Sequence, residues 1–415
     1  MPPKQPASRL GWFYGVGILV IILGVAGYTF RRYISPVIPA LAPASGDIAK
    51  DIEHANEVST DTSATAPVRE LPLTMPDGVS LRVFAKGLSD PRDLDVDPNG
   101  HVMVSVPNKG TVVYLNEQTD GTAKPTTLVS GLNQPHGLAF SCEDDGVCLL
   151  FVAATDAVYR FDYDSVNVSA TNKTKILDLP TGGRHITRSL FAHDNKLFIS
   201  IGSSCDVCHE SDERRGTIMV SEYDGTNARV YAKGLRNSVF IAHSPTTHQL
   251  WATDMGRDNL GDNIPPDEVN IVKDGGNYGW PNCYGNNIHD TAFDKNTYIR
   301  NPCMAPFETP AHIEFPAHSA PLGLAFFPKE WPEEYRDDLL VAFHGSWNRS
   351  VPDGYKLERV KLDAKGNVGE QDNFVTGWLN AKNQASGRPV DVLFRGKDLF
   401  VSDDKSGVVY RFTAP

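Results

Sequence analysis

Hydrophobic and polar positions alternate in short runs along most of the chain, and the runs recur with a period of about 40 to 50 residues. Each unit opens with a strand-like run such as Pro135-His136-Gly137-Leu138-Ala139-Phe140. A second apolar run follows after a turn, as in Leu149-Leu150-Phe151-Val152, and a third usually ends on an aromatic or aliphatic residue. This alternation is typical of half-buried β-strands.

The repeated units predict the fold class. Their first strands begin at Pro91, Pro135, Thr187, Asn237, Pro321 and Pro389. Repeats of this length are typical of propeller blades, whose radial arrangement leaves only short protected sheet edges. We therefore predict an all-β protein, with a six-bladed β-propeller that forms one domain over residues 71–415. A two-sheet sandwich is the alternative, but it does not account for the similar units.

The fourth and fifth units are separated by nearly 90 residues, about twice the usual spacing. This gap predicts a long insertion near residues 260–315 that projects from the propeller. Long ordered loops often carry function, so the insertion is a candidate part of the site.

The N-terminal region has a different character. Residues 12–30 contain no charged side chain and are long enough to cross a bilayer as a helix. We expect residues 1–32 to form an N-terminal transmembrane helix that anchors the chain in a membrane; a cleavable signal peptide is the alternative. Residues 33–70 are rich in Pro, Ala, Ser and Thr, which predicts a flexible tether or linker.

Composition and charge narrow the choice of partners. The chain has 39 Lys and Arg residues against 51 Asp and Glu residues, a net charge of -12. It contains no basic run that would follow a phosphate backbone, so we expect no nucleic-acid partner. The 35 glycines and 29 prolines suit many tight turns between short strands.

Six cysteines fall into three locally spaced pairs, which are Cys142 with Cys148, Cys205 with Cys208, and Cys283 with Cys303. An even number of paired cysteines favours disulfides and an extracytoplasmic location, on the periplasmic or extracellular face of a membrane. The run Cys205-Asp206-Val207-Cys208-His209 also matches the pattern for covalent haem attachment. Its strand-rich surroundings favour a local disulfide over haem or zinc.

Residues just before the first strand of each blade converge at one end of the central channel. In this chain they are Arg92, His136, His185 with Arg188, Arg236 with Asn237, His318 with Ser319, and Arg388. Such a concentration of basic side chains in an acidic protein predicts an anionic ligand. Taken singly, His136 is also consistent with a packed histidine of the core.

The insertion adds oxygen-rich loops. Residues 261–268 and 275–281 combine carboxylates with Gly and Pro, whose exposed carbonyls suit a hard cation such as calcium. The spacing is not that of an EF-hand, and a solvated acidic loop is the alternative.

Four motifs together suggest a family. They are Gly234-Leu235-Arg236-Asn237, the stretch from Gly261 to Pro281, Phe343-His344-Gly345-Ser346-Trp347-Asn348-Arg349, and Gly387-Arg388-Pro389-Val390-Asp391-Val392. Over residues 71–415 the chain resembles the soluble pyrroloquinoline quinone (PQQ)-dependent sugar dehydrogenases, especially their sorbosone and aldose dehydrogenase branch. That family is a six-bladed propeller that binds PQQ through calcium.

The resemblance implies roles for individual residues. His185 matches the general base that removes a substrate hydroxyl proton while hydride moves to the quinone, and Asp267 would assist it. Arg236 and Asn237 match cofactor contacts, and Arg236 would also stabilise developing negative charge. Arg388 matches a partner of a PQQ carboxylate. Arg349 and His136 are further candidate cofactor contacts.

The same resemblance implies two calcium ions. Gly261 and Asp262 would offer backbone carbonyls to a calcium ion bound to the cofactor. Glu268 and Tyr278 resemble the ligands of a second, structural calcium ion.

The function expected is oxidation of a sugar hydroxyl or hydrated aldehyde by hydride transfer to calcium-bound PQQ. Electrons would pass to an external acceptor, a quinone or a cytochrome. Two alternatives are a calcium-dependent propeller hydrolase of lactonase type and a propeller without catalysis that serves as a binding module. The hydrolase would need a metal at the channel centre held by Glu, Asn and Asp, whereas Arg and His dominate the expected mouth.

Overall fold

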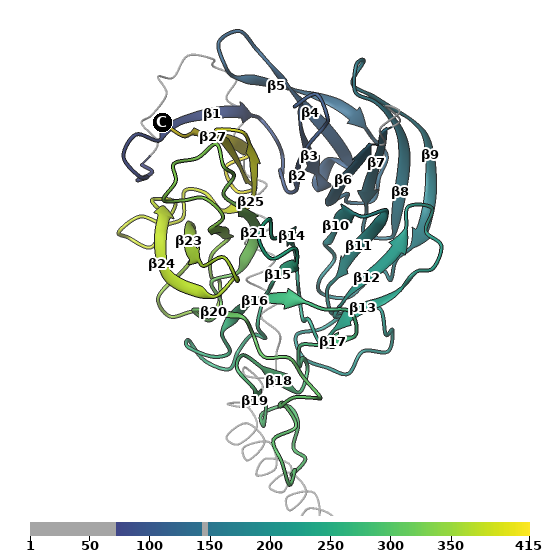
Figure 1. Cartoon of the computed structure of the whole chain (residues 1–415), viewed down its shortest axis with the longest axis vertical. Helices are drawn as coiled ribbons and strands as arrows, with labels where there is room; N and C mark the ends of the chain where they lie inside the picture. Colours follow the sequence, from purple (N-terminus) through teal and green to yellow (C-terminus); the bar gives the residue numbers. More distant parts are fainter. Residues whose placement is uncertain (1–71, 143–147) are drawn as a thin grey trace, which may run out of the picture. The chain divides into compact units, whose positions relative to one another are not determined.

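The computed structural model describes residues 72–142 and 148–415, and these form a ring of β-sheets around a central channel (Figure 1). The predicted anchor at residues 12–30 and the predicted tether lie outside the described residues. Within the part of the chain that is described, no helix has the length and apolar character needed to cross a membrane.

Six sheets correspond to the six predicted units. Blade one comprises β2 (Leu94–Val96), β3 (Val102–Val106), β4 (Thr111–Glu117) and β5 (Ala123–Val129), with a short 3-10 helix at Pro107–Lys109. Blade two comprises β6 (Gly137–Cys142), β7 (Cys148–Ala153), β8 (Ala157–Asp164) and β9 (Ser169–Asp178). Blade three comprises β10 (Arg188–His193), β11 (Lys196–Ile201), β12 (Thr217–Glu222) and β13 (Arg229–Lys233).

The remaining three blades complete the ring. Blade four comprises β14 (Ile241–His243), β15 (Leu250–Asp254), β16 (Asp267–Val272) and β20 (Ile313–Phe315). Blade five comprises β21 (Pro321–Phe326), β22 (Leu339–Phe343), β23 (Lys356–Leu362) and β24 (Val368–Val375). Blade six comprises β25 (Pro389–Arg395), β26 (Asp398–Asp403), β27 (Val408–Thr413) and, as its outer strand, β1 (Ser80–Lys86). Because β1 pairs with β27, the two ends of the propeller close the ring (Figure 1).

The burial of each strand follows its position in the blade. The second strands of the blades, such as β3, β15 and β22, are buried at every position because neighbouring blades cover both of their faces. The fourth strands face solvent, and in β9 and β24 most side chains are partly or fully exposed. The predicted propeller is therefore confirmed, with the first three strands of each blade at the expected places.

The predicted insertion lies inside blade four. Two long loops, residues 255–266 and 273–312, separate β15 from β16 and β16 from β20. The second loop carries β17 (Gly276–Asn277), which pairs in parallel with β13 of blade three, and the hairpin of β18 (Cys283–Tyr284) and β19 (Ile288–His289). The insertion thus ties blade four to blade three.

All three predicted disulfides form, which are Cys142–Cys148, Cys205–Cys208 and Cys283–Cys303. The Cys205–Cys208 bond uses both sulfur atoms that covalent haem attachment would need. The disulfide interpretation of this motif is therefore confirmed.

Candidate active site

A cavity of about 260 Å³ opens where the chain enters the inner strands of blades three to six, and we call it the mouth pocket. Loops of several blades contribute to its wall. The lining residues are Arg184, His185, Arg236, Asn237, Met255, Gly256, Asp258, Asp267, His318, Ala320, His344, Gly345, Trp347, Asn348 and Arg388. Of the residues predicted for catalysis or cofactor binding, the fold brings His185, Arg236, Asn237, Asp267 and Arg388 together here.

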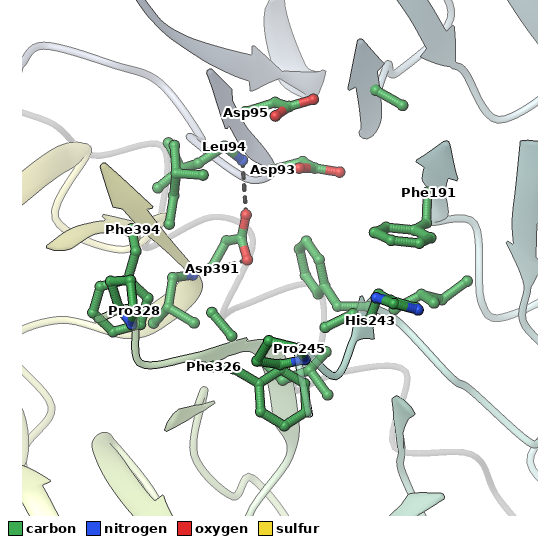
Figure 2. A pocket seen from close by; sticks show the side chains of 18 of the residues that line it. Asp93, Leu94, Asp95, Phe191, His243, Pro245, Phe326, Pro328, Asp391 and Phe394 are labelled. Atoms are coloured by element: carbon green, nitrogen blue, oxygen red, sulfur yellow. Dashed lines mark hydrogen bonds between the residues drawn. The ribbon is translucent and has the colours of Figure 1, made fainter. Parts of the chain in front are cut away.

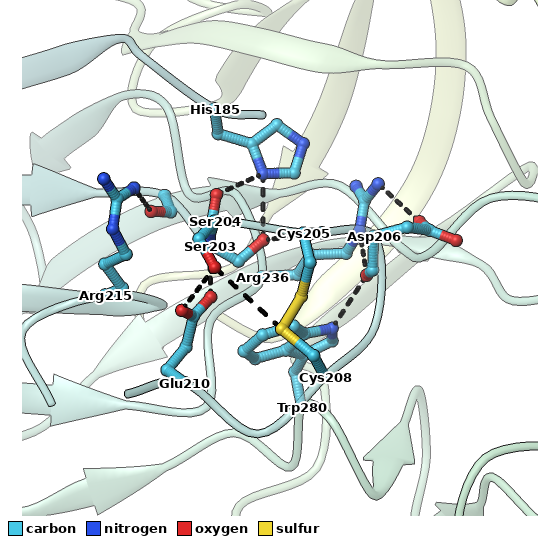
Figure 3. Close-up of a disulfide and its surroundings, with 11 residues drawn as sticks. His185, Ser203, Ser204, Cys205, Asp206, Cys208, Glu210, Arg215, Arg236 and Trp280 are labelled. Carbon is cyan, nitrogen blue, oxygen red and sulfur yellow. Dashed lines mark hydrogen bonds and ion pairs between the residues drawn. A yellow bond between two sulfur atoms is a disulfide. The ribbon is translucent and has the colours of Figure 1, made fainter. Parts of the chain in front are cut away.

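His185 is held by the segment that follows β11. Its Nδ1 lies 2.9 Å from the Ser203 hydroxyl and 3.1 Å from the Ser203 carbonyl oxygen (Figure 3). Burial and the neighbouring Arg236 and Arg184 guanidiniums lower the pKa of His185 well below its usual value. The imidazole is therefore neutral at physiological pH, in the form that accepts a proton.

Gly202 allows His185 and Asn237 to approach each other. A Cβ at position 202 would lie 2.5 Å from the Asn237 side-chain oxygen and 2.7 Å from the His185 Cβ. Such distances are shorter than ordinary van der Waals contact, so a side chain here would displace one of the two residues. The glycine at the end of β11 is thus a requirement of the site's geometry.

Arg236 is almost fully buried and its guanidinium is fixed from two sides. It donates from Nη2 to Asp206 Oδ1 at 2.8 Å and to Asp258 Oδ2 at 2.9 Å, and from Nε to the Asp206 carbonyl at 3.0 Å. Asp258 also pairs with Arg184 at 2.8 Å. The positive charge of Arg236 and Arg184 is therefore partly neutralised, contrary to the strongly basic mouth predicted from the sequence.

Arg388 differs from Arg236 in its partners. Its guanidinium donates to the carbonyl oxygens of His344 at 3.0 Å and Gly345 at 2.7 Å, and its centre lies 5.6 Å from the Tyr355 ring. Among the described residues, no carboxylate lies within ion-pair distance of it. Arg388 therefore makes no direct ion pair, although its charge contributes to lowering the pKa of the Asp404 carboxyl.

Asp267 and His344 complete the polar wall. Burial raises the pKa of Asp267 to about 6, and its carboxylate accepts hydrogen bonds from the Gly256 and Ala320 amides at 2.9 and 2.8 Å. His344 contacts the Asp404 carboxylate through Nε2 at 2.9 Å, and burial lowers the pKa of His344 to about 4. Asp267 forms no hydrogen bond with His185; its carboxylate oxygens accept from two backbone amides and from the Ser319 hydroxyl.

Six residues predicted for cofactor or metal contacts lie outside this pocket, and they are His136, Arg349, Gly261, Asp262, Glu268 and Tyr278. His136 is buried in the wall of a neighbouring cavity of about 180 Å³ together with Arg92. The Arg349 guanidinium donates to the carbonyls of Ala317 and Val351. Gly261 accepts a hydrogen bond from His318 Nε2 at 2.8 Å, and the Asp262 carboxylate is bonded by Ser350.

Arg188 also departs from the expected arrangement at the mouth. Its guanidinium is buried and donates to the carbonyls of Pro180, His185 and Thr187. It therefore supports the loop that carries His185 and does not point a free charge at a ligand.

Glu268 and Tyr278 line a separate small cavity of about 20 Å³ beneath the insertion. Asp254 and Asp290 share its wall. Burial raises the pKa of Glu268 to about 7, and burial together with the Glu268 charge raises that of Asp254 well above its usual value. The Tyr278 hydroxyl is already used by the backbone of Ile271 and Lys273, so only its carbonyl is available to a ligand.

Several lining residues were not predicted for any role. Trp347 is 61% exposed and its ring lies 5.8 Å from the Arg184 guanidinium. Asn348 donates to Asp258 at 2.9 Å, while its side-chain oxygen is buried without a partner in the structure. Both belong to the motif that begins at Phe343, which was the signal that could have singled them out. No sequence signal marked Asp258.

The central channel forms a second, larger cavity of about 700 Å³ (Figure 2). Its wall is mainly apolar and includes Phe191 and Phe326, but it also contains two buried aspartates, Asp93 and Asp391, and a half-buried one, Asp95. Asp391 accepts the Leu94 amide at 2.8 Å and Asp93 accepts the Leu138 amide at 3.1 Å, so each joins one blade to the next. The third, Asp95, accepts the Val96 amide at 2.7 Å. These carboxylates are used by the backbone and hold the ring together.

Sequence comparison places the chain among known proteins. An uncharacterized protein of Borreliella burgdorferi is 29% identical over 373 residues, covering 84% of this chain and 93% of the relative. A pyrroloquinoline quinone-dependent pyranose dehydrogenase of Coprinopsis cinerea is 23% identical over 415 residues, covering 83% of this chain. The chain spans only 55% of that fungal protein's length.

Solved structures share the fold, and a family description covers nearly the whole propeller. The holo PQQ domain of the Coprinopsis cinerea pyranose dehydrogenase aligns with a TM-score of 0.71 at 20% identity, covering 84% of this chain and 98% of that domain. A calcium structure of a Trichoderma reesei carbohydrate-active enzyme of family AA12 aligns with a TM-score of 0.70 at 22% identity, covering 83% and 98% of the two chains. The TrAA12-like family matches residues 73–414, and the chain belongs to this family.

Proposed function

We propose that this protein is a quinoprotein oxidoreductase that oxidises a sugar hydroxyl or hydrated aldehyde with PQQ. The observation that carries the proposal is that His185, with Nδ1 beside Ser203, shares a pocket with Arg388, whose guanidinium makes no direct ion pair. The TrAA12-like family supports it, because relatives of this chain are named as PQQ-dependent pyranose and sugar dehydrogenases.

The residues of the mouth pocket fit a planar cofactor with several carboxylates. Arg388 supplies a charge that a carboxylate can compensate, and guanidinium–carboxylate pairs are strong and directional. The buried, unpartnered side-chain oxygen of Asn348 indicates a polar group that the protein alone leaves unsatisfied. The exposed Trp347 ring offers a flat surface beside the opening.

PQQ, when bound, supplies a quinone carbon that accepts a hydride from the substrate carbon. His185 would take the hydroxyl proton on Nε2, the nitrogen that Ser203 does not contact. Loss of a hydride and a proton oxidises the substrate by two electrons. Arg236, held by Asp206 and Asp258, would stabilise negative charge that develops in the pocket.

Calcium binding is proposed at Glu268. Two buried carboxylates, Glu268 and Asp254, face one small cavity, and a divalent cation would relieve the cost of burying both charges. The Gly261 carbonyl fits a cofactor-bound ion less well because it already accepts from His318. Ser350 bonds the Asp262 carboxylate and not the backbone carbonyl expected to bind the ion. The geometry thus supports the structural calcium ion more than the catalytic one.

We further propose that the propeller works on the outer side of a membrane, held by the apolar segment at residues 12–30. The three disulfides support an oxidising compartment. Electrons would leave through an external acceptor, a quinone or a cytochrome.

The proposal is tested by loading the full-length protein with PQQ and calcium and measuring reduction of an artificial acceptor dye over a panel of sugars and aldehydes. Dye reduction that requires PQQ and at least one substrate of the panel is expected. A folded protein that binds no PQQ would refute the proposal and lead back to the hydrolase and binding-module alternatives.

A further inference from the structure

A short disulfide-closed loop contacts two residues that line the mouth pocket, His185 and Arg236 (Figure 3). It runs from Ser203 to Glu210, and Cys205–Cys208 closes it. The loop contacts the two side chains to which the proposed function gives the main roles, because Ser203 contacts His185 and Asp206 contacts Arg236.

We infer that Ser203 is a positioning residue that fixes the tautomer of His185, keeping the proton on Nδ1 and leaving the Nε2 lone pair free toward the pocket. The catalytic consequence rests on the proposed function, but the tautomer itself does not.

The hydrogen-bond partners of His185 Nδ1 support the inference. The Ser203 carbonyl oxygen, 3.1 Å from Nδ1, can only accept a hydrogen bond. The Ser203 hydroxyl, 2.9 Å from Nδ1, donates its own proton to the Cys205 carbonyl at 2.6 Å and so presents a lone pair to the ring. With two acceptors beside it, Nδ1 carries the proton, and a neutral imidazole then has an unprotonated Nε2.

The disulfide determines where the acceptor of the serine proton lies. Cys205 stands at the start of the ring closed by Cys205–Cys208, so its carbonyl is held in place for Ser203. The next residue, Asp206, uses its carbonyl to accept from Arg236 Nε at 3.0 Å and from Trp280 Nε1 at 3.2 Å. One loop therefore orients both the base and the guanidinium.

The partners of Nδ1 carry no charge, and this affects the protonation state of His185. A carboxylate there would favour the protonated imidazolium, whereas a hydroxyl and a carbonyl add no negative charge. The charged groups that face His185 are the guanidiniums of Arg184, Arg188 and Arg236. Asp258 and Asp206 pair with two of these guanidiniums and lie beyond them. This arrangement keeps His185 neutral near physiological pH.

The inference is tested by measuring the imidazole 15N shifts of His185 in the full-length protein without cofactor, with the signals assigned by comparison with His185→Gln. We expect a protonated-type Nδ1 and an unprotonated-type Nε2 at neutral pH. The opposite tautomer in the wild-type protein would overturn the inference. Because no cofactor is present, this result does not depend on whether the proposed function is correct.

A pair of variants separates positioning from general loop stability. Ser203→Ala removes one of the two acceptors, and loss of one hydrogen bond predicts a shift of about fivefold in the tautomer ratio toward Nε2–H. Ser204→Ala is the matched control, because the Ser204 hydroxyl bonds Glu210 and does not contact His185. Equal shifts in the two variants, or none in Ser203→Ala, would contradict the assignment.

The disulfide's contribution has its own control. Replacing Cys205 and Cys208 by serine is expected to mix the His185 tautomers, while the same change at Cys142 and Cys148, in blade two, leaves them as in the wild type. In the PQQ-loaded enzyme, Ser203→Ala should lower kcat by at most the roughly fivefold change in the tautomer ratio, with little change in KM. Unchanged His185 shifts in the Cys205 and Cys208 double variant would show that the loop holds without its disulfide, against the inference.

Discussion

The mouth pocket and the central channel are lined by neighbouring positions of the same inner strands, yet their polar groups are used differently. Arg388 belongs to the pocket and Asp391, three residues further along, belongs to the channel. Asp391 is bonded to the amides of Leu94 and Val392. The Arg388 guanidinium donates only to neutral carbonyls, while its backbone amide donates to the Asp403 carboxylate.

The difference shows that cavity size is a poor guide to function here. The channel measures about 700 Å³ and the mouth pocket about 260 Å³. In the larger cavity, the bonded aspartates hold adjacent blades together. In the smaller one, His185 and the Arg388 guanidinium, which makes no direct ion pair, line the space that a bound molecule would occupy. Polar groups left unsatisfied by the protein distinguish the site from the scaffold.

The largest effect is expected at His185. Changing His185 to Gln should lower kcat by about 10² to 10⁴-fold, the range for loss of a general base, while PQQ affinity changes little. In the wild type, the acid limb of kcat/KM should lie below the usual histidine pKa, because burial and Arg236 lower the pKa of His185. Activity is then lost only as pH falls through that lowered value. Equal losses of turnover and PQQ binding would contradict the role of base.

A smaller effect is expected at Arg388. Arg388→Gln should weaken PQQ binding by about 10 to 100-fold, because a charge-assisted hydrogen bond to a cofactor carboxylate is lost. Arg349→Gln serves as the control, since Arg349 lies outside the mouth pocket and bonds the carbonyls of Ala317 and Val351. Equilibrium titration with PQQ measures both. Similar losses of PQQ affinity in the two variants would contradict a specific role of Arg388 in binding the cofactor.

Substitution of Glu268 tests whether the small cavity under the insertion binds calcium. Calcium at a hundredfold excess over its Kd should stabilise the wild-type protein by about 2.7 kcal/mol, and Glu268→Gln should abolish this gain. In chelator, the variant should be at least as stable as the wild type, because it lacks one of two buried carboxylates that face each other. Thermal unfolding with and without calcium measures both effects. A calcium gain that persists in the variant would place the ion elsewhere.

The smallest effect on activity is expected in the channel. Asp391→Asn should lower the free energy of unfolding by about 1 kcal/mol, because an amide can replace only part of the carboxylate's bonding to Leu94 and Val392. Denaturant unfolding and the dye assay give the two readouts. A large loss of kcat with unchanged stability would mean that the channel takes part in the reaction.

The blades could be predicted because their inner and second strands bury apolar side chains in strict alternation or in continuous runs. The outer strands could not, because β9 and β24 face solvent and carry no such pattern. The strand β1, which closes the ring, could not be predicted for another reason. Its partner β27 lies at the opposite end of the chain, and nothing local in residues 80–86 encodes that pairing.

The residues of the site also include some that the sequence could predict and some that it could not. Position before an inner strand correctly brought His185, Arg236, Asn237 and Arg388 to one pocket. It failed for His136, which lines a separate cavity together with residues such as Arg92 and Thr187 that precede the inner strands of blades one and three. Ser203 has no motif of its own, since its role depends on the direction of one hydroxyl proton.

The central claim is that the mouth pocket binds PQQ and passes substrate electrons to it. Anaerobic addition of sugar to the full-length protein loaded with PQQ and calcium tests this most directly, by following the cofactor's absorption spectrum. We predict reduction of the bound cofactor by the sugar in the wild type and none in His185→Gln. Bound cofactor that stays oxidised with every sugar and aldehyde tried, or failure of PQQ to bind, would contradict the claim.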